Sequence, residues 1–106
     1  MAQVESLDIQ ALLSGYTSGA FSPMEIVDEV LARIAAGKRE NVWITQLTRD
    51  QIIAYVDALK DASPETHPLF GIPFAIKDNI DLAAVPTTAA CAEYEYTPEE
   101  SAYVVE

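Results

Sequence analysis

One lysine stands on an otherwise apolar stretch, and at this place the sequence points to chemistry. Residues 68–81 read PLFGIPFAIKDNID. Because side chains alternate between the two faces of a strand, Phe74 and Ile76 share one face and Lys77 lies on the other. The carboxylate of Asp78 follows directly. A lysine carried inward on a strand costs free energy unless it is paired or used in chemistry.

The lysine motif, residues 71–80, reads GIPFAIKDNI and resembles the lysine motif of the amidase signature family. The continuation 81–91, DLAAVPTTAAC, and the upstream residues 41–44, NVWI, resemble the allophanate hydrolase branch. The resemblance runs from about residue 22 to residue 106. It implies that Lys77 is the general base of a Ser–cis-Ser–Lys triad, which hydrolyses an amide through an acyl-enzyme.

The two catalytic serines of that family lie downstream of the lysine, in a segment rich in glycine and serine. The 106 residues contain no such segment. We therefore expect the N-terminal part of an allophanate hydrolase-like amidase, truncated before the serines and inactive alone. The implied parent reaction is hydrolysis of allophanate or a related small amide. A general amidase or the amidase component of an amidotransferase is the alternative, because these proteins share the lysine motif.

A lysine that acts as a base must be uncharged near neutral pH, whereas the ordinary pKa of a lysine is about 10.4. Only deep burial lowers a lysine pKa by the roughly 3–5 units required. A neighbouring carboxylate such as Asp78 favours the charged form instead. Two interpretations of Lys77 therefore stay open: the general base of a complete amidase, and a solvated or ion-paired lysine in the isolated chain.

The length and the net charge of the chain limit the kinds of partner that it could bind. We expect residues 1–106 to form a single domain that resembles the N-terminal portion of an amidase-signature domain. Six basic and 17 acidic side chains give a formal net charge of -11. This charge is opposite to the basic surface that nucleic-acid binding requires, so no nucleic-acid partner is expected. The apolar runs are far shorter than the ~20 residues of a membrane helix.

Cysteine and histidine usage argue against a disulfide, a metal site and a cofactor. Cys91 is the single cysteine, and the N-terminus lacks the features of a signal peptide, so we expect a cytoplasmic protein. His67 is the single histidine, and no cluster of ligands accompanies it. No metal and no cofactor are therefore expected.

Helical spacing of apolar residues predicts helices over residues 6–14, 23–36 and 49–62, and a short fourth helix over 101–106. The second and third helices begin with the Ser/Thr-x-x-Glu/Gln pattern of a capping box. The apolar stripe of the second helix places Leu31 in the core.

Two strands are predicted from β-branched and aromatic residues, over residues 42–47 and 72–80. With the helices they define an α/β fold, in which three helices pack on a small β-sheet or hairpin as a partial amidase-signature fold. We expect Trp43, Phe74 and Ile76 in its core.

The connection over residues 81–84 is predicted to be a turn. Members of the family that the chain resembles usually carry glycine where Ala84 stands. If this turn needs a positive φ, the alanine costs about 1 kcal/mol.

Residues 85–106 suggest a second hypothesis, a non-catalytic self-associating or partner-binding module. Several of their apolar side chains would be covered in a complete amidase and need cover here. These are Val85, Tyr94, Tyr96, Tyr103, Val104 and Val105. We expect either a homodimer built from this segment or binding of the missing C-terminal amidase portion. A reading frame that resumes after Glu106 favours the fragment, and a stop codon favours the independent module.

Overall fold

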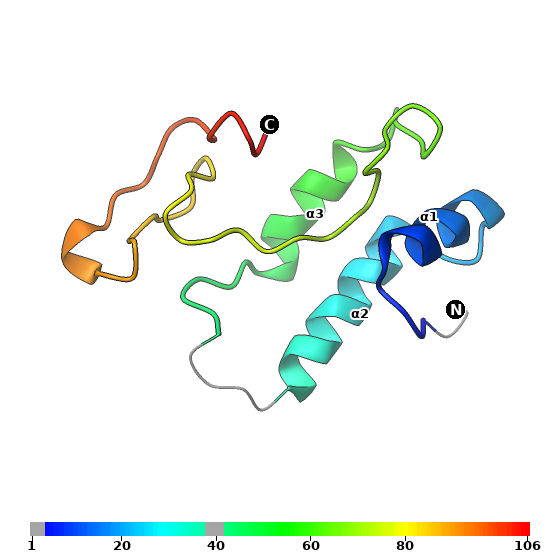
Figure 1. Cartoon of the computed structure of the whole chain (residues 1–106), viewed down its shortest axis with the longest axis horizontal. Coiled ribbons are helices and arrows are strands. Elements are labelled where there is room, and N and C mark those ends of the chain that lie inside the picture. Colours follow the sequence, from blue (N-terminus) through cyan, green and yellow to red (C-terminus); the bar gives the residue numbers. More distant parts are fainter. Residues whose placement is uncertain (1–3, 38–41) are drawn as a thin grey trace. The chain divides into compact units, whose positions relative to one another are not determined.

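The computed structural model describes residues 4–37 and 42–106 (Figure 1). The described residues form three α-helices and a short 3-10 helix: α1 (Ile9–Ser18), α2 (Pro23–Ala36), α3 (Arg49–Asp57) and η1 (Ala92–Tyr94). They divide into two compact units, a helical unit of residues 4–37 and 47–73 and a lysine unit of residues 42–46 and 74–106. No helix in these described ranges is long and apolar enough to cross a membrane.

Helix α1 runs through Gly15, where the sequence predicted its end. The carboxylate of Asp8 caps its N-terminus by accepting a hydrogen bond from the backbone N–H of Ala11 at 2.7 Å. Gly19, with a φ of 78°, ends the helix instead. Gly15 is buried inside it because the ring of Phe21 occupies the space where a larger side chain would lie. The glycine thus permits close packing and does not break the helix.

Helix α2 has the predicted bounds, and Ser22 caps it through the backbone N–H of Glu25. Its fully buried residue is Ile26, whereas Leu31 is only partly buried and does not reach the core. The most deeply buried part of this helix therefore lies nearer its N-terminus than the sequence predicted.

Helix α3 begins with a complete capping box between Thr48 and Gln51 but ends at Asp57, before the predicted end near residue 62. It packs beside α2 (Figure 1). Arg49 donates to the carboxylate of Asp28 at 2.7 Å and joins the two helices.

The core of the helical unit is formed by Val4, Leu12 and Ile26. Partly buried residues pack around them, namely Leu7, Tyr16, Phe21, Val30 and Ile72. Arg33 donates to the backbone carbonyl of Val4 at 2.9 Å, which fastens the N-terminal segment to α2. Full burial of such a side chain is worth ~1.5–3 kcal/mol, so this small cluster is the main apolar contribution to the fold.

The predicted sheet or hairpin is absent from the part of the chain that the structure describes. Residues 42–47 and 72–80 contain no strand, and one isolated antiparallel bridge pairs Thr87 with Tyr96. The side chains of Trp43 and Phe74 are 45% and 71% exposed, so neither lies in a core, and Ile76 is only partly buried. A strand needs a hydrogen-bonded neighbour, and an isolated pair of strands is marginal in water. The alternating pattern alone therefore does not produce a sheet.

The segment after Thr97 also differs from the prediction. It contains no helix and ends in a turn, in which the backbone N–H of Val105 bonds to the carbonyl of Ala102 at 2.8 Å. A helix of two turns has few internal hydrogen bonds to offset the entropy lost on forming it.

Tyr16 fastens the start of the lysine motif to α1 within the helical unit. Its hydroxyl donates to the backbone carbonyl of Gly71 at 2.6 Å. Its ring meets the rings of Phe21 and Phe70 edge to face, with centroids 5.5 Å apart in each pair. Gly71 has a φ of 66° and lies so close to the Tyr16 ring that a larger side chain would collide with it. Burial raises the pKa of Tyr16 to about 12.

We expect the helical unit to lose stability as the pH rises from about 10 to about 12, because Tyr16 must stay protonated in the fold. A pKa raised by folding contributes stability below pH 10, and this contribution disappears as the pH passes the folded value. Denaturant unfolding at a series of pH values measures the effect. The variant Tyr16→Phe should be less stable at pH 8 but decline less steeply above pH 10. Parallel pH profiles for the two proteins would contradict the assignment.

Candidate site around Lys77

Lys77 lies exposed at the beginning of a turn in the lysine unit. Its backbone carbonyl accepts a hydrogen bond from the N–H of Ile80 at 3.0 Å, which closes the turn. Within the described ranges, the two ion pairs join Arg33 to Glu29 and Arg49 to Asp28, so no carboxylate pairs with Lys77. Among the described residues, Lys77 is therefore exposed and has no carboxylate partner.

The carboxylate of Asp78 is held by the turn over residues 88–91 and is not directed to its neighbour Lys77. It accepts hydrogen bonds from the backbone N–H of Thr88 at 3.1 Å, from the Thr88 hydroxyl, and from the N–H of Ala90 at 3.5 Å. The backbone carbonyl of Asp78 accepts a fourth, from the N–H of Ala89 at 2.8 Å. These bonds, the Thr88 hydroxyl foremost, lower the pKa of Asp78.

Asp81 makes a second connection of the same kind. Its carboxylate accepts from the hydroxyl of Thr87 at 3.1 Å and from the hydroxyl of Tyr96. Its backbone carbonyl accepts from the N–H of Ala102 at 2.9 Å. The hydrogen bond to Asp81 is the main cause that raises the pKa of Tyr96. Asp81 thus gathers three later parts of the chain around the residues that follow Lys77.

Three alanines of this unit have a positive φ, a conformation that favours glycine. Ala84, at 65°, is the third residue of the turn 82–85, as in a type II turn, and this agrees with the expectation from sequence. Ala89 and Ala90, at 51° and 63°, are the central residues of the turn 88–91, as in a type I′ turn. Because type I′ turns normally contain asparagine or glycine there, the sequence has no signal for this turn.

Sequence reasoning singled out Lys77 but missed the residues that organise its surroundings. Thr87 and Thr88 are buried, and each binds one of the two aspartates through its hydroxyl. The only sequence signal for these contacts was an Asp-x-x-Asp pattern followed by a Thr-Thr pair. Such a pattern is too common to predict which residues bind one another.

The chemistry open to these residues by themselves is limited. Lys77 presents an exposed amine, and the hydroxyl oxygen of Ser101, the serine of this unit, accepts from the backbone N–H of Ala83 at 2.9 Å. In the described ranges, no group of three histidine, cysteine, aspartate or glutamate side chains could hold a metal ion. An activated serine nucleophile therefore needs residues beyond those around Lys77.

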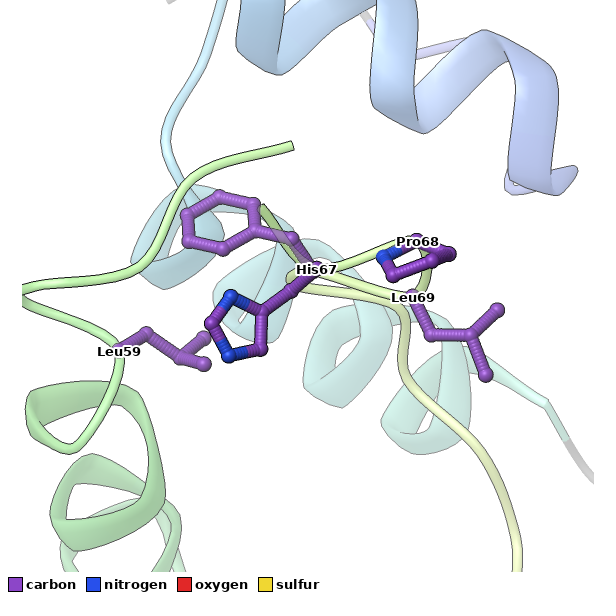
Figure 2. Close-up of a pocket in the computed structure, with 5 residues that line it drawn as sticks. Leu59, His67, Pro68 and Leu69 are labelled. Atoms are coloured by element: carbon purple, nitrogen blue, oxygen red, sulfur yellow. The ribbon is translucent and has the colours of Figure 1, made fainter. Parts of the chain in front are cut away.

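The helical unit has a shallow apolar hollow beside the end of α3 (Figure 2). It is lined by Leu59, His67, Pro68, Leu69 and Phe70. His67 is exposed, and its Nδ1 shares a hydrogen bond of 2.8 Å with the hydroxyl of Thr66. With one titratable side chain and no second polar group directed at it, this hollow has no arrangement for catalysis.

Comparison with known proteins places the chain in a family. The sequence model of the family described as Amidase matches residues 25–106, which include the whole lysine motif. The chain belongs to the amidase family, and the resemblance found in its motif is confirmed. It is 33% identical over 91 residues to urea amidolyase of Saccharomyces cerevisiae. It is 32% identical over 107 residues to the A subunit of the glutamyl-tRNA(Gln) amidotransferase of Natranaerobius thermophilus.

A solved structure gives the same relationship. The crystal structure of the K. lactis urea amidolyase matches 92% of the chain with a TM-score of 0.74 and 31% identity. The described residues, with three α-helices and no strand, thus match a fragment of the amidase fold. The chain spans about 5% of the length of the yeast urea amidolyase and about 22% of the Natranaerobius protein. The matches cover 85% and 97% of this chain.

We expect the substitution Ala84→Gly to leave the lysine unit about 1 kcal/mol more stable than the matched glycine substitution at residue 83 does, because glycine adopts a positive φ without a steric penalty. The neighbouring Ala83→Gly is the matched control, since Ala83 has no positive φ. This control should destabilise by about 0.5–1 kcal/mol through the added freedom of the unfolded chain. Amide hydrogen exchange of residues 82–102 measures both effects. Equal shifts in the same direction would show that the backbone conformation of Ala84 is not the one described.

Proposed function

We propose that this chain supplies the lysine-bearing part of an amidase active site, with Lys77 as the general base. The parent reaction is hydrolysis of allophanate or a related small amide. The observation that carries the proposal is the family match over residues 25–106, which aligns the complete motif around Lys77 with amidases. The likeness to urea amidolyase, in sequence and in structure, supports allophanate as the substrate over the amide of an amidotransferase.

The proposed reaction uses a serine nucleophile and a bridging serine that these 106 residues do not contain. The nucleophilic serine attacks the amide carbon, and its proton passes through the bridging serine to the neutral amine of Lys77. The resulting ammonium of Lys77 then gives this proton to the leaving nitrogen, the C–N bond breaks and ammonia leaves. Water hydrolyses the acyl-enzyme in the second half of the reaction. The exposed position of Lys77 here lacks the burial that a lysine base needs, so burial must come from further protein.

A chimera tests the role of Lys77. Residues 25–106 replace the matched stretch of the Saccharomyces cerevisiae urea amidolyase, and ammonia release from allophanate is measured. We expect an active chimera and a loss of about 10²–10⁴-fold in kcat on Lys77→Ala, because a positioned base contributes that much. The variant Lys60→Ala is the control and should retain full activity. An active chimera that tolerates Lys77→Ala would refute the proposal.

The isolated chain should release no ammonia from allophanate, biuret or simple amides, because it has no serine segment to supply the nucleophile. Turnover that disappears in the Lys77→Ala variant would contradict this expectation. Turnover that persists in the variant would identify a contaminating enzyme.

The second candidate function is that of a self-associating module, and the exposure of residues 94–106 favours it. Tyr103 and Val104 are 94% and 79% exposed, and Tyr94 and Tyr96 are exposed as well. Large apolar side chains gathered in one segment are typical of an interaction surface. Glu93, Glu95, Glu99 and Glu100 would repel their counterparts across a twofold axis, so they belong at the rim of such a dimer.

Under this second candidate we expect a homodimer at micromolar concentration, weakened by deletion of residues 97–106 because the deletion removes Tyr103 and Val104. Sedimentation equilibrium over a tenfold range of concentration measures the mass. The substitution Glu99→Gln with Glu100→Gln is a milder variant, which should strengthen the dimer at low salt by reducing repulsion. A monomer mass in all three proteins would exclude the dimer and leave the amidase portion as the expected cover.

A further inference from the structure

Asp78 accepts hydrogen bonds through both its side chain and its backbone carbonyl. Three donors reach its carboxylate and a fourth reaches its backbone carbonyl, and all four come from Thr88, Ala89 and Ala90. The residue directly after Lys77 is therefore fixed, through both its side chain and its main chain, to a segment ten residues further along. Hydrogen bonds to a carboxylate are stronger than hydrogen bonds between neutral groups, so they hold the backbone next to Lys77 firmly.

The turn that holds Asp78 is itself in a strained conformation. Ala89 and Ala90 both have a positive φ, which opposes the ordinary preference of alanine. Such backbone persists only where surrounding contacts impose it, and here the contact is the carboxylate of Asp78. The turn and the aspartate thus hold one another, and the backbone at Lys77 is held with them.

The same arrangement removes the nearest carboxylate from Lys77. An unengaged Asp78 would be the adjacent anion and would stabilise the charged ammonium. Because both carboxylate oxygens are engaged by the turn, the amine stays without a carboxylate partner among the described residues.

We propose that Asp78 is a positioning residue for Lys77, which fixes the backbone of the lysine and, by binding the turn 88–91, keeps its own charge away from the amine. The inference rests on the proposed role of Lys77 as a base, since an unpaired amine matters for accepting a proton. Thr88 is the second half of this arrangement, because its hydroxyl and its N–H both bind the carboxylate.

Competitive acylation of lysines in the full chain tests the proposal. Trace acetic anhydride at neutral pH labels Lys77 and Lys60, and mass spectrometry gives the ratio of their rates, with Lys60 as the internal reference. The substitution Thr88→Val removes the hydroxyl donor, which leaves the carboxylate oxygen Oδ2 with only the 3.5 Å bond from the N–H of Ala90. This oxygen should then turn toward Lys77 and slow its labelling by about threefold, because a paired ammonium loses its proton less readily. The double variant Thr88→Val with Asp78→Asn should restore the rate, since no carboxylate remains. The conservative Thr88→Ser should behave like the wild type.

Amide NMR signals of Thr88 and Ala90 report the hydrogen bonds directly and should move in Asp78→Asn and Thr88→Val but not in Thr88→Ser. The proposal is overturned if Asp78→Asn alone speeds labelling of Lys77 by about threefold, because the carboxylate would then already pair with the amine. It is also overturned if Thr88→Val leaves the labelling rate unchanged. If Thr88→Val does not fold, the labelling rates of Asp78→Asn and Thr88→Ser still test the proposal. Labelling of Lys77 does not depend on amide hydrolysis. The chimera could therefore be inactive, which would contradict the proposed function, while the labelling results still support the positioning role of Asp78.

Discussion

The lysine unit depends on hydrogen bonds between two aspartates and two buried threonines. Asp78 binds Thr88, and Asp81 binds Thr87 and Tyr96. The buried apolar side chains of the described ranges belong to the helical unit, so the lysine unit has no apolar core of its own. Its shape is set by where hydrogen-bond donors and acceptors meet.

The helical unit, in contrast, is held together by helix caps and by a buried apolar cluster. Its helices begin at residues with side-chain caps, and its core is a small cluster around Leu12 and Ile26. Two hydrogen bonds connect the helices to other segments of this unit. Arg33 donates to a backbone carbonyl of the N-terminal segment, and the hydroxyl of Tyr16 donates to the carbonyl of Gly71, where the lysine motif begins. Apolar burial thus holds one end of the motif, while carboxylates hold the residues that follow Lys77.

Under the proposed function, the chain carries one component of a catalytic site and some of its positioning contacts. A lysine becomes a base only when burial destabilises its charge, and a serine becomes a nucleophile only beside such a base. The 106 residues contain the lysine and the turn that keeps Asp78 engaged, whereas their relatives in the amidase family are several times longer. Tyr103 and Val104 are exposed, and under either proposed function further protein or a second copy covers them.

The sequence by itself determined the three α-helices and the family and singled out Lys77 as a candidate, because capping residues, apolar spacing and a contiguous motif are local signals. It also indicated the positive φ at Ala84. Tertiary structure decided the rest: the sheet did not form, Phe74 stayed exposed, and Gly15 lay inside a helix against Phe21. It also decided that Asp78 binds Thr88 and not Lys77. These outcomes depend on partners distant in the chain, and a periodic pattern specifies which face is apolar but not what will cover it.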